Sequence, residues 1–364
     1  MNRYLQICCV LSLLMSLSFL LGCGKSADEP TDWVVDEQPV TPVEPEPIFA
    51  DVSEATLSLK LQPGDHFPLR KVVEQELVQS SPSGQPTVAR SRLELMFAIS
   101  VLAVEEGRTK LRLRYDRVNY QHNVADEHVE YDSERPPFSL PMAVRPYHDM
   151  VGDGFAFWLG TNNQIVEVDG FAEFIERCLA NVNPEQRPQV ILGIEAGTDG
   201  ESGIANIVDN SIGLLPPMKK QTQGDSWERM QPVQRPVPMM INNTFTLKEL
   251  TQDYAVIDIR GAITPSTSMS AVEAGNGVRI TVTGGETGGS SVIFRETGLP
   301  KESTVVRKID MNVMLTGGIQ FQQTKKVTTT IEAFPVSSTP PTIIGGRTNR
   351  NSHIQPVGHE VLVR

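Results

Sequence analysis

The sequence predicts a mainly β protein of the α+β class, in which two curved antiparallel β-lobes, half-barrel-like in form, are joined by a helical insert. Three observations lead to this prediction. Apolar and polar residues alternate over many long segments, a helical repeat of apolar residues is confined to the middle of the chain, and the alternating segments fall into two sets of similar order. Long antiparallel strands with one polar face form curved sheets that shelter a core on one side.

The chain of 364 residues begins with an apolar segment that ends at a cysteine. Arg3 precedes an uncharged run at 5–21, which has the order of a secretory signal and is at the short limit for a transmembrane anchor, the alternative interpretation. The run closes with Leu-Leu-Gly-Cys, which resembles the lipobox of bacterial lipoproteins. This resemblance implies a signal peptide at 1–22, cleavage between Gly22 and Cys23, and a lipid on the Cys23 thiol that anchors the protein without spanning the membrane.

Both ends of the mature chain have the composition of unstructured polypeptide. Residues 23–50 follow the predicted cleavage site, and 24–50 hold five prolines and seven acidic residues against one lysine, which predicts an extended tether. Gly24 follows the lipidated cysteine, and not aspartate, which favours the periplasmic side of the outer membrane. Residues 336–364 are rich in Ser, Pro, Gly and Asn and are predicted to be a flexible tail.

The part between tether and tail divides into a first β-lobe at 51–168, a helical insert at 169–217 and a second β-lobe at 218–335. In the first lobe, alternation at 93–101 and 111–115, with a turn between them, predicts an antiparallel hairpin. Further strands are predicted at 72–79, 164–168, 245–250, 255–263, 278–282, 290–294, 303–315 and 319–334. The glycine-rich segment 284–289 is predicted to be the hairpin loop between two of them.

Helical periodicity marks the insert. One helical face is predicted to carry Phe171, Phe174, Ile175, Cys178 and Leu179, and 184–215 predicts two more helices. Cys178 is the one cysteine left once the signal peptide is removed and Cys23 is lipidated, so no internal disulfide is possible. We predict that Cys178 packs in the core.

The two strand sets open with similar motifs, Gly64-Asp65-His66-Phe67 and Gly224-Asp225-Ser226-Trp227. Each set later has an aromatic segment, Gly154-Phe155-Ala156-Phe157 and Ser291-Val292-Ile293-Phe294, that leads through a glycine turn to another strand. Together with the lipobox, these motifs resemble a family of uncharacterised bacterial envelope lipoproteins found in planctomycetes and Bacteroidetes-type bacteria. The resemblance implies an envelope lipoprotein and gives no catalytic residues to carry over. Duplication of one lobe remains one of two explanations for the repeat, chance being the other.

The composition excludes one class of partner. Removal of residues 1–22 takes away the single charge of Arg3 and changes the formal net charge from −12 to −13. Nucleic acid is recognised through many Lys and Arg contacts to phosphate, so an acidic chain of this kind does not predict a nucleic-acid partner.

Few side chains suggest chemistry. His122, Asp126, Glu127 and His128 lie close in sequence, with His148, Asp149 and Asp153 following, but 123–146 is predicted to be a long solvated loop that fixes no metal geometry. Trp158 and Trp227 are predicted to fill the ends of the first and second lobes. Each indole N–H is expected to donate a hydrogen bond to a carbonyl oxygen. We therefore predict no catalytic residues, no metal and no cofactor.

Three functions remain open from sequence. The leading prediction is a non-enzymatic, lipid-anchored envelope protein that acts as a scaffold or binding module for another envelope protein. The second is a carrier of a hydrophobic ligand, such as a lipid or acyl chain, held between sheet and helices. The third is a hydrolase. The sequence does not identify the ligand-binding residues.

Overall fold

The computed structural model describes the greater part of the region between the predicted tether and tail. It describes residues 53–80, 85–124, 127–161, 163–187, 212–216, 219–233, 237–266, 272–273, 278–315 and 317–334. The predicted signal peptide, Cys23, the tether, the tail and most of the two helices predicted at 184–215 lie outside these residues.

The described chain is mainly β and antiparallel, as the sequence predicts, with 64% strand and 7% helix. The first strand set is β2 (His66–Gln79), β3 (Thr87–Glu105), β4 (Arg108–Val124), β5 (Glu127–Asp132), β6 (Gly154–Gly160) and β7 (Ile165–Asp169). The second set is β9 (Ser226–Val233), β10 (Met239–Leu250), β11 (Tyr254–Pro265), β12 (Val272–Glu273), β13 (Arg279–Phe294), β14 (Pro300–Met314) and β15 (Gln320–Ala333). The short strands β1 (Ala55–Thr56) and β8 (Lys220–Gln221) pair with each other.

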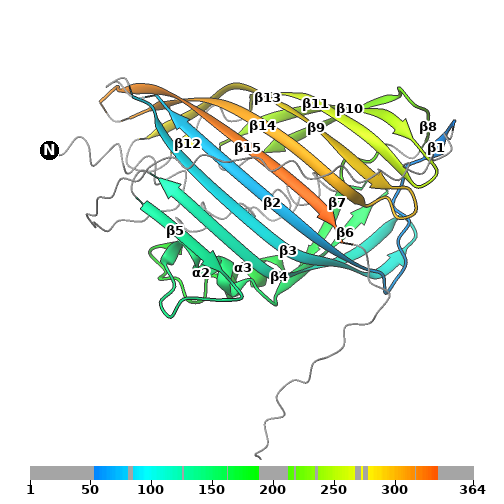
Figure 1. Ribbon diagram of the computed structural model, residues 1–364, viewed down its shortest axis with the longest axis horizontal. Coiled ribbons are helices and arrows are strands. Elements are labelled where there is room, and N and C mark those ends of the chain that lie inside the picture. Colours follow the sequence, from blue (N-terminus) through cyan, green and yellow to red (C-terminus); the bar gives the residue numbers. More distant parts are fainter. Residues whose placement is uncertain are drawn as a thin grey trace, which may run out of the picture. The chain divides into compact units, whose positions relative to one another are not determined.

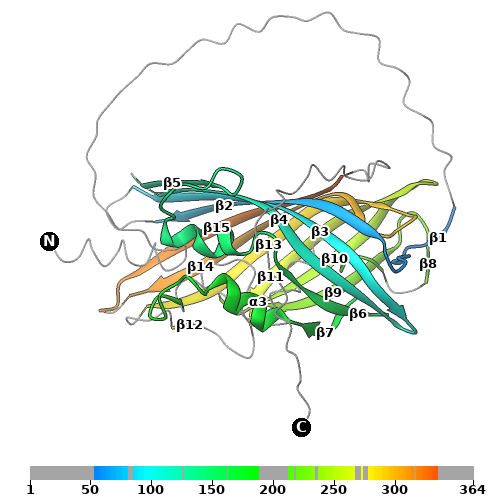
Figure 2. The same cartoon turned by 90° about the horizontal axis from the view of Figure 1, so that it is seen from below.

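The two strand sets share one sheet. The strand order is β7-β6-β4-β3-β2-β15-β14-β13-β11-β10-β9, with β5 on β4 and β12 on β13. The pairing of β2 with β15 joins the sets along eleven residue pairs, from Gln79 with Gln323 to Leu69 with Ala333. The sheet is not closed into a barrel. It is curved: the strands run side by side in Figure 1, whereas in the view of Figure 2 β2 and β3 cross β13 and β14 at an angle.

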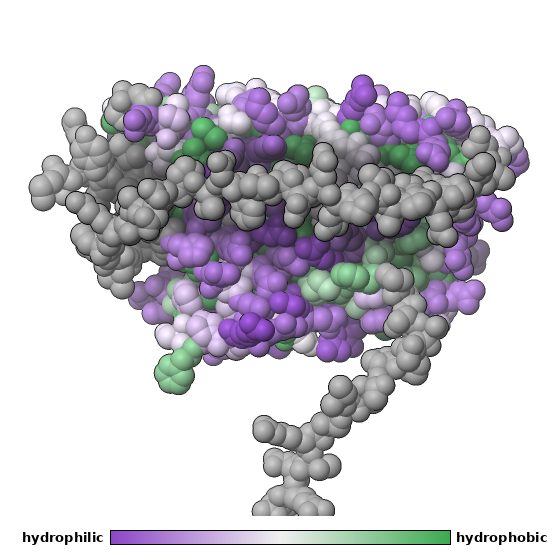
Figure 3. All heavy atoms as spheres, in the orientation of Figure 1, coloured by the Kyte–Doolittle hydropathy of each residue, from purple (hydrophilic) through white to green (hydrophobic). Residues whose placement is uncertain are grey.

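The sheet has an apolar inner face and a polar outer face. We define the inner face by its buried residues, among them Leu95 on β3, Leu113 on β4 and Ile257 on β11. Since residues directly opposite each other on paired strands point to the same side, the strand register assigns the other side chains. The described part of the outer face over β2, β3 and β4 is largely hydrophilic (Figure 3).

Two helices cover the inner face of the first strand set. They are α2 (Arg145–Asp149), which follows the short turn of helix η1 (Met142–Val144), and α3 (Phe171–Cys178). Both contribute to one core with β3, β4 and β6, through Tyr147 and Phe174 among others. None of the helices in the described residues is long and apolar enough to span a membrane.

Several predictions in the first strand set are confirmed. The hairpin pairs β3 with β4 around the turn at 106–107, and Leu93, Leu95, Phe97, Ile99 and Val101 are all buried. The predicted helix runs from Phe171 to Cys178, and Cys178 is buried in the core. The alternation of apolar residues was therefore a sound guide where strands are neighbours in sequence.

The predicted hairpin loop at 284–289 is wrong, because this segment lies inside the continuous strand β13. A Cβ atom on Gly285 would lie 2.2 Å from the carbonyl oxygen of Lys308 on β14, and one on Gly289 would lie 2.0 Å from that of Thr304. The glycines therefore allow two long strands to approach closely and do not form a turn.

The predicted solvated loop at 123–146 is also wrong in part. It contains β5, which pairs with the end of β4, and the short helix η1. The five-residue helix α2, with proline in its first turn, follows at Arg145–Asp149, so helix is not confined to the insert. These elements are too short for their periodicity to be recognised in the sequence.

The two tryptophans differ in role. Trp227 is buried, and its indole N–H donates to the carbonyl of Leu214 at 3.1 Å, as predicted. Trp158 is buried too, but its register with Lys110 on β4 places it on the outer face. There the guanidinium of Arg108 lies 4.1 Å from the ring centroid. The prediction that Trp158 plugs the first lobe is therefore wrong.

The two strand sets begin with the same turn. Gly64 and Gly224 have left-handed backbone, with φ of 97° and 92°. The carboxylate of the next residue, Asp65 or Asp225, accepts the backbone N–H three residues earlier at 2.7 and 2.8 Å. This hydrogen bond lowers the pKa of Asp225. The matching motifs in the sequence thus correspond to matching local structure.

Candidate functional site

A row of polar side chains crosses the inner face of the second strand set. Arg229 on β9 lies opposite Asn243 on β10, and Thr287 on β13 lies opposite Arg307 on β14. Gly261 on β11 pairs with both Asn243 and Thr287, so these residues form one continuous row. We call Arg229, Asn243, Thr287 and Arg307 the polar belt. Apolar side chains flank it on both sides, among them Ile259 and Ile263.

The charged side chains of the inner face are of one sign. Among the strand side chains that the structure describes, the register assigns to this face Lys71, Arg229, Arg307 and Lys325, and no carboxylate. All four are half-buried. The outer face, by contrast, carries both cationic and anionic side chains. Its carboxylates include Glu74, Glu76 and Asp310. Because the chain as a whole is acidic, composition does not account for this set of cations among the described side chains.

Buried polar atoms without a partner lie beside these cations. Within the described residues, no hydrogen bond is made by the hydroxyls of Thr287, Ser291 and Ser303 or by the amide groups of Gln323. These residues are at most 4% exposed. A buried polar group left unpaired costs about 1 to 3 kcal/mol, so several on one face indicate that something else meets them.

Their positions cluster around β14. Ser291 and Ser303 are opposite each other on β13 and β14, and Thr287 is opposite Arg307. On the other side of β14, Gln323 of β15 is opposite Gln79 of β2, which is also buried with an unpaired amide oxygen. The unpaired groups and the cations therefore occupy the same part of the sheet.

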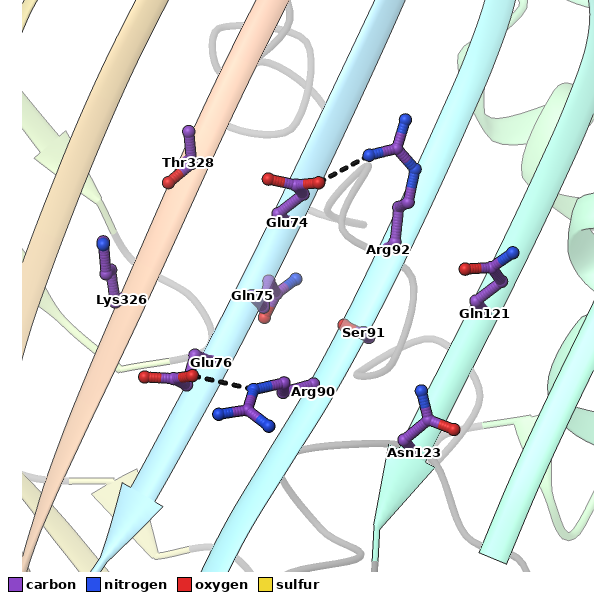
Figure 4. A pocket seen from close by; sticks show the side chains of 10 residues that line it. All are labelled: Glu74, Gln75, Glu76, Arg90, Ser91, Arg92, Gln121, Asn123, Lys326 and Thr328. Carbon is purple, nitrogen blue, oxygen red and sulfur yellow. Dashed lines mark hydrogen bonds and ion pairs between the residues drawn. The ribbon is translucent and has the colours of Figure 1, made fainter. Parts of the chain in front are cut away.

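A second site, on the outer face, is a shallow groove over β15, β2, β3 and β4 (Figure 4). Its volume is about 310 Å³. Glu74 binds Arg92, and Glu76 binds Arg90 at 2.8 Å. Because these carboxylates are already paired and solvent-exposed, the groove is a salt-bridged surface with little energy in each pair. The geometry does not suggest catalysis.

The core under the helices is filled by aromatic rings. Phe174 stacks on Tyr115 at 5.8 Å between centroids and lies 5.4 Å from Phe155, which also meets Phe171 at 5.0 Å. Burial raises the pKa of the Cys178 thiol to about 12, so this thiol is protonated and inert near neutral pH. This region has the features of packing and not of a ligand site.

The residues that the sequence suggested for a metal are dispersed. His122 is buried beside Tyr120, whereas His128 is exposed. His148 accepts or donates a hydrogen bond with the hydroxyl of Tyr131 at 2.7 Å, and Asp153 pairs with Arg177. Asp126 lies outside the described residues. Within the residues that are described, no three His, Cys, Asp or Glu side chains form a group that could hold a metal ion.

The sequence analysis overlooked the polar belt, although a signal was present. Arg307 stands between Val305 and Ile309 at alternate positions of one strand, and Lys325 stands between Gln323 and Val327. A cation at the apolar position of an alternating strand is unusual because burial of a charge is costly. Alternation identifies which segments are strands, and the charges that fall on the apolar side of a strand are a separate signal.

Comparison with protein families gives one match. The model of a family of unknown function, DUF6263, matches residues 106–300. The chain belongs to this family. The DUF6263 match includes Asn243 and Thr287 of the polar belt, whereas Arg307 and Lys325 lie beyond it. A search of curated proteins finds no match.

Comparison with solved structures gives likenesses of low score. A lipovitellin structure that describes lipid–protein interactions has a TM-score of 0.40 at 12% identity, over 77% of this chain. The chain spans about a quarter, 26%, of that lipovitellin chain. An outer membrane channel from Pseudomonas putida F1 has a TM-score of 0.16 at 12% identity, with 80% of this chain and 100% of that chain covered. OmpF of Salmonella typhi has a TM-score of 0.18 at 8% identity, with 74% and 98% covered. None of these likenesses bears on function.

Proposed function

We propose that this protein is a lipid-anchored binding module of the bacterial cell envelope that carries a hydrophobic ligand on the inner face of its second strand set. The anchor is Cys23, and the location is the periplasmic side of the outer membrane. The tether at 24–50 lets the folded part work away from the membrane surface. No catalytic step is part of the proposal.

The observation that supports a ligand is the set of unpaired buried groups within an otherwise apolar face. Around them lies a core formed by strand and loop residues, with Leu77, Ile241, Val282, Val313 and Phe321 among its buried members. No described helix contributes to this core, whereas α2 and α3 both contribute to the core of the first strand set. Ligand sites in proteins are typically apolar with a few placed polar groups, which is the pattern found here.

The place of the ligand differs from the one that the sequence suggested. A carrier site between sheet and helices would need space beneath α3, but Phe171 and Phe174 fill that position against Phe155 and Tyr115. The helices therefore act as a fixed part of the core, and the second strand set offers the binding surface.

The anchor is tested in cells. Cys23→Ser should abolish incorporation of labelled palmitate and leave a precursor that retains residues 1–22, because the acylated thiol is gone. Labelling equal to that of the unaltered protein would contradict the anchor.

The ligand is tested by native mass spectrometry. Residues 24–364 would be exported in the original host behind a signal peptide without a lipobox and purified without detergent. We expect a mass above that of the chain, which organic extraction reduces to the chain mass while releasing a lipid. A chain that carries no lipid after purification, and takes up none from vesicles of host lipid, would contradict the carrier function.

A further inference from the structure

We propose that the outer face of the sheet binds a neutral glycan chain along a polar track that crosses six strands, from β13 to β4. We define the polar track as the shallow groove over β15, β2, β3 and β4 together with a second groove over β13, β14 and β15. The inference goes beyond the proposed function and does not depend on it, because it concerns the opposite face of the sheet and a different class of ligand.

The second groove lies near the turn between β14 and β15, and its volume is about 550 Å³. On its floor, Asp310 of β14 is opposite Thr324 of β15, and the Asp310 carboxylate accepts a hydrogen bond from the Thr324 hydroxyl at 2.8 Å. Asn312 of β14 is opposite Gln322 of β15, one step closer to the turn. These four side chains point outward, since the residues between them, such as Met311, are buried on the inner face.

The two grooves meet on β15. Thr324 lines the second groove and Lys326 lines the first, and these are successive outward positions of one strand, about 7 Å apart. From Lys326 the row continues to Glu76 on β2, Arg90 on β3 and Asn123 on β4, each opposite the one before. Figure 4 shows this row crossing the first groove. The polar track is therefore continuous across the six strands.

The outward side chains that line the polar track are polar and balanced in charge. Among the described ones, the charged members are Lys326, Arg90, Arg92, Glu74, Glu76 and Asp310, and none of the described ones is apolar. Glu74 pairs with Arg92, and Glu76 pairs with Arg90, so each pair offers donors and acceptors without a net charge. The polar track therefore presents many hydrogen-bonding groups and equal numbers of both charges.

This lining favours a neutral ligand that is rich in hydroxyl groups. An acyl lipid would need an apolar lining, and an anionic polymer would need an excess of cations. An extended peptide adds to the free edge of a sheet, but each strand of the polar track is paired on both sides. Sugar hydroxyls both donate and accept hydrogen bonds, as do the amides of Gln121, Asn312 and Gln322 that line the grooves.

The repeat of the sheet also suits a polymer of sugars. Neighbouring strands are about 4.8 Å apart, which is close to the length of one sugar unit in an extended glycan. The outward row Thr328, Glu74, Arg92 and Gln121 supplies one polar side chain on each of four successive strands. A glycan that lies across the strands can therefore place one sugar over each of them, and a longer chain contacts more strands.

The experiment compares glycans that differ in length and in charge. Residues 24–364 would be titrated in a calorimeter with chitobiose and chitohexaose, with cellobiose and cellohexaose, and with an alginate hexamer as the anionic counterpart. We expect a neutral hexamer to bind at least about tenfold tighter than its dimer and than the alginate hexamer, which corresponds to about 1.4 kcal/mol. A preference for chitohexaose identifies acetamido sugars, and a preference for cellohexaose identifies sugars that carry hydroxyls alone.

Binding should depend on both grooves. Asn312→Ala with Thr328→Ala removes one hydrogen-bonding side chain from each groove and should weaken binding of the hexamer at least about fivefold. Asn242→Ala with Thr244→Ala removes the same two residue types from the outer face of β10, outside both grooves, and is the matched control. The control should keep the affinity within about twofold, because no groove contact is lost.

A second pair of substitutions covers a failure of the first to fold. Gln121→Ala with Gln322→Ala removes one exposed amide from each groove, and the same loss of affinity is expected. Neutral hexamers that do not bind, that bind no tighter than their dimers, or that bind no tighter than the alginate hexamer would overturn the glycan. Equal losses in the groove variant and the β10 variant would overturn the site. Lipid carriage is measured separately by native mass, so either proposal can fail without the other.

Discussion

The inner face of the first strand set and that of the second differ in what fills them. The first is packed with aromatic rings from α3, β4 and β6, and it carries one charged side chain, Lys71, among those described. The second is mostly aliphatic beside the rings of Trp227, Phe245 and Phe321, carries Arg229, Arg307 and Lys325, and contains glycines at inner-face positions such as Gly285 and Gly289. One continuous sheet therefore has a half whose core is completed by its own helices and a half in which the buried hydroxyls of Thr287, Ser291 and Ser303 make no hydrogen bond within the described residues.

From this difference we infer that the two halves of the sheet have different roles. Aromatic packing of the first kind stabilises a fold through buried area and ring contacts. Buried hydroxyls and amides of the second kind lower stability unless something pairs with them. Proteins retain such groups at functional sites, so the second half is where we expect the selected function to lie.

The largest expected effect is in the first half. Phe174 is fully buried and contacts Tyr115, Phe155 and Phe171, so Phe174→Ala should lower the free energy of unfolding by about 3 to 5 kcal/mol. Arg112→Ala, on the exposed side of β4, should lower it by less than about 0.5 kcal/mol. Denaturant titration measures both, and similar small losses would show that the helices do not complete a core.

A smaller effect is expected in the second half, from a methyl group on β13. Gly285→Ala would bring a Cβ atom to 2.2 Å from a carbonyl oxygen of β14 and should cost about 1 to 3 kcal/mol. Gly288→Ala has its nearest contact at 3.8 Å and should instead stabilise by about 0.5 to 1 kcal/mol, because alanine loses less chain entropy. The same effect of both substitutions on thermal unfolding would contradict the close approach of β13 to β14 at Gly285.

The smallest effect concerns the ion pair that holds α3 to the sheet. The guanidinium of Arg177 donates to the Asp153 carboxylate at 2.6 and 3.0 Å and lowers the pKa of Asp153. A lowered pKa contributes stability above the unfolded value of about 3.9, and this stability is lost as the pH falls further. Asp153→Asn should therefore reduce thermal stability slightly at neutral pH, and the difference from the unaltered protein should shrink as the pH falls below the unfolded value. A difference that stays constant as the pH is lowered would contradict the ion pair.

The sequence predicted the parts of the fold that depend on local patterns. Alternation identified the β3–β4 hairpin, and the helical repeat identified α3. It could not predict that β2 would pair with β15, because this contact joins residues more than 240 positions apart and nothing in the pattern specifies it. Glycine runs mark turns in most chains. Here Gly285 and Gly289 lie inside a strand instead and allow β13 and β14 to approach closely.

The candidate site was hidden for a related reason. Thr287, Arg307 and Gln323 lie on three consecutive strands, and only the strand register places them on one part of one face. The histidines and carboxylates that the sequence suggested for a metal are dispersed. His148 is hydrogen-bonded to Tyr131, and Asp153 is hydrogen-bonded to Arg177. The informative signal was the position of a charge within an alternating strand, which sequence reasoning can include.

The most direct test of the division between the two halves is to locate the ligand. Residues 24–364 would be incubated with oleate that carries a photoreactive diazirine in its chain, irradiated, digested and sequenced by mass spectrometry. We expect labelled peptides from 303–315 and 320–327, with unlabelled oleate in excess suppressing the labelling. Labels concentrated at 93–101 and 171–178, beneath the helices, would contradict the assignment of structure to the first half and binding to the second.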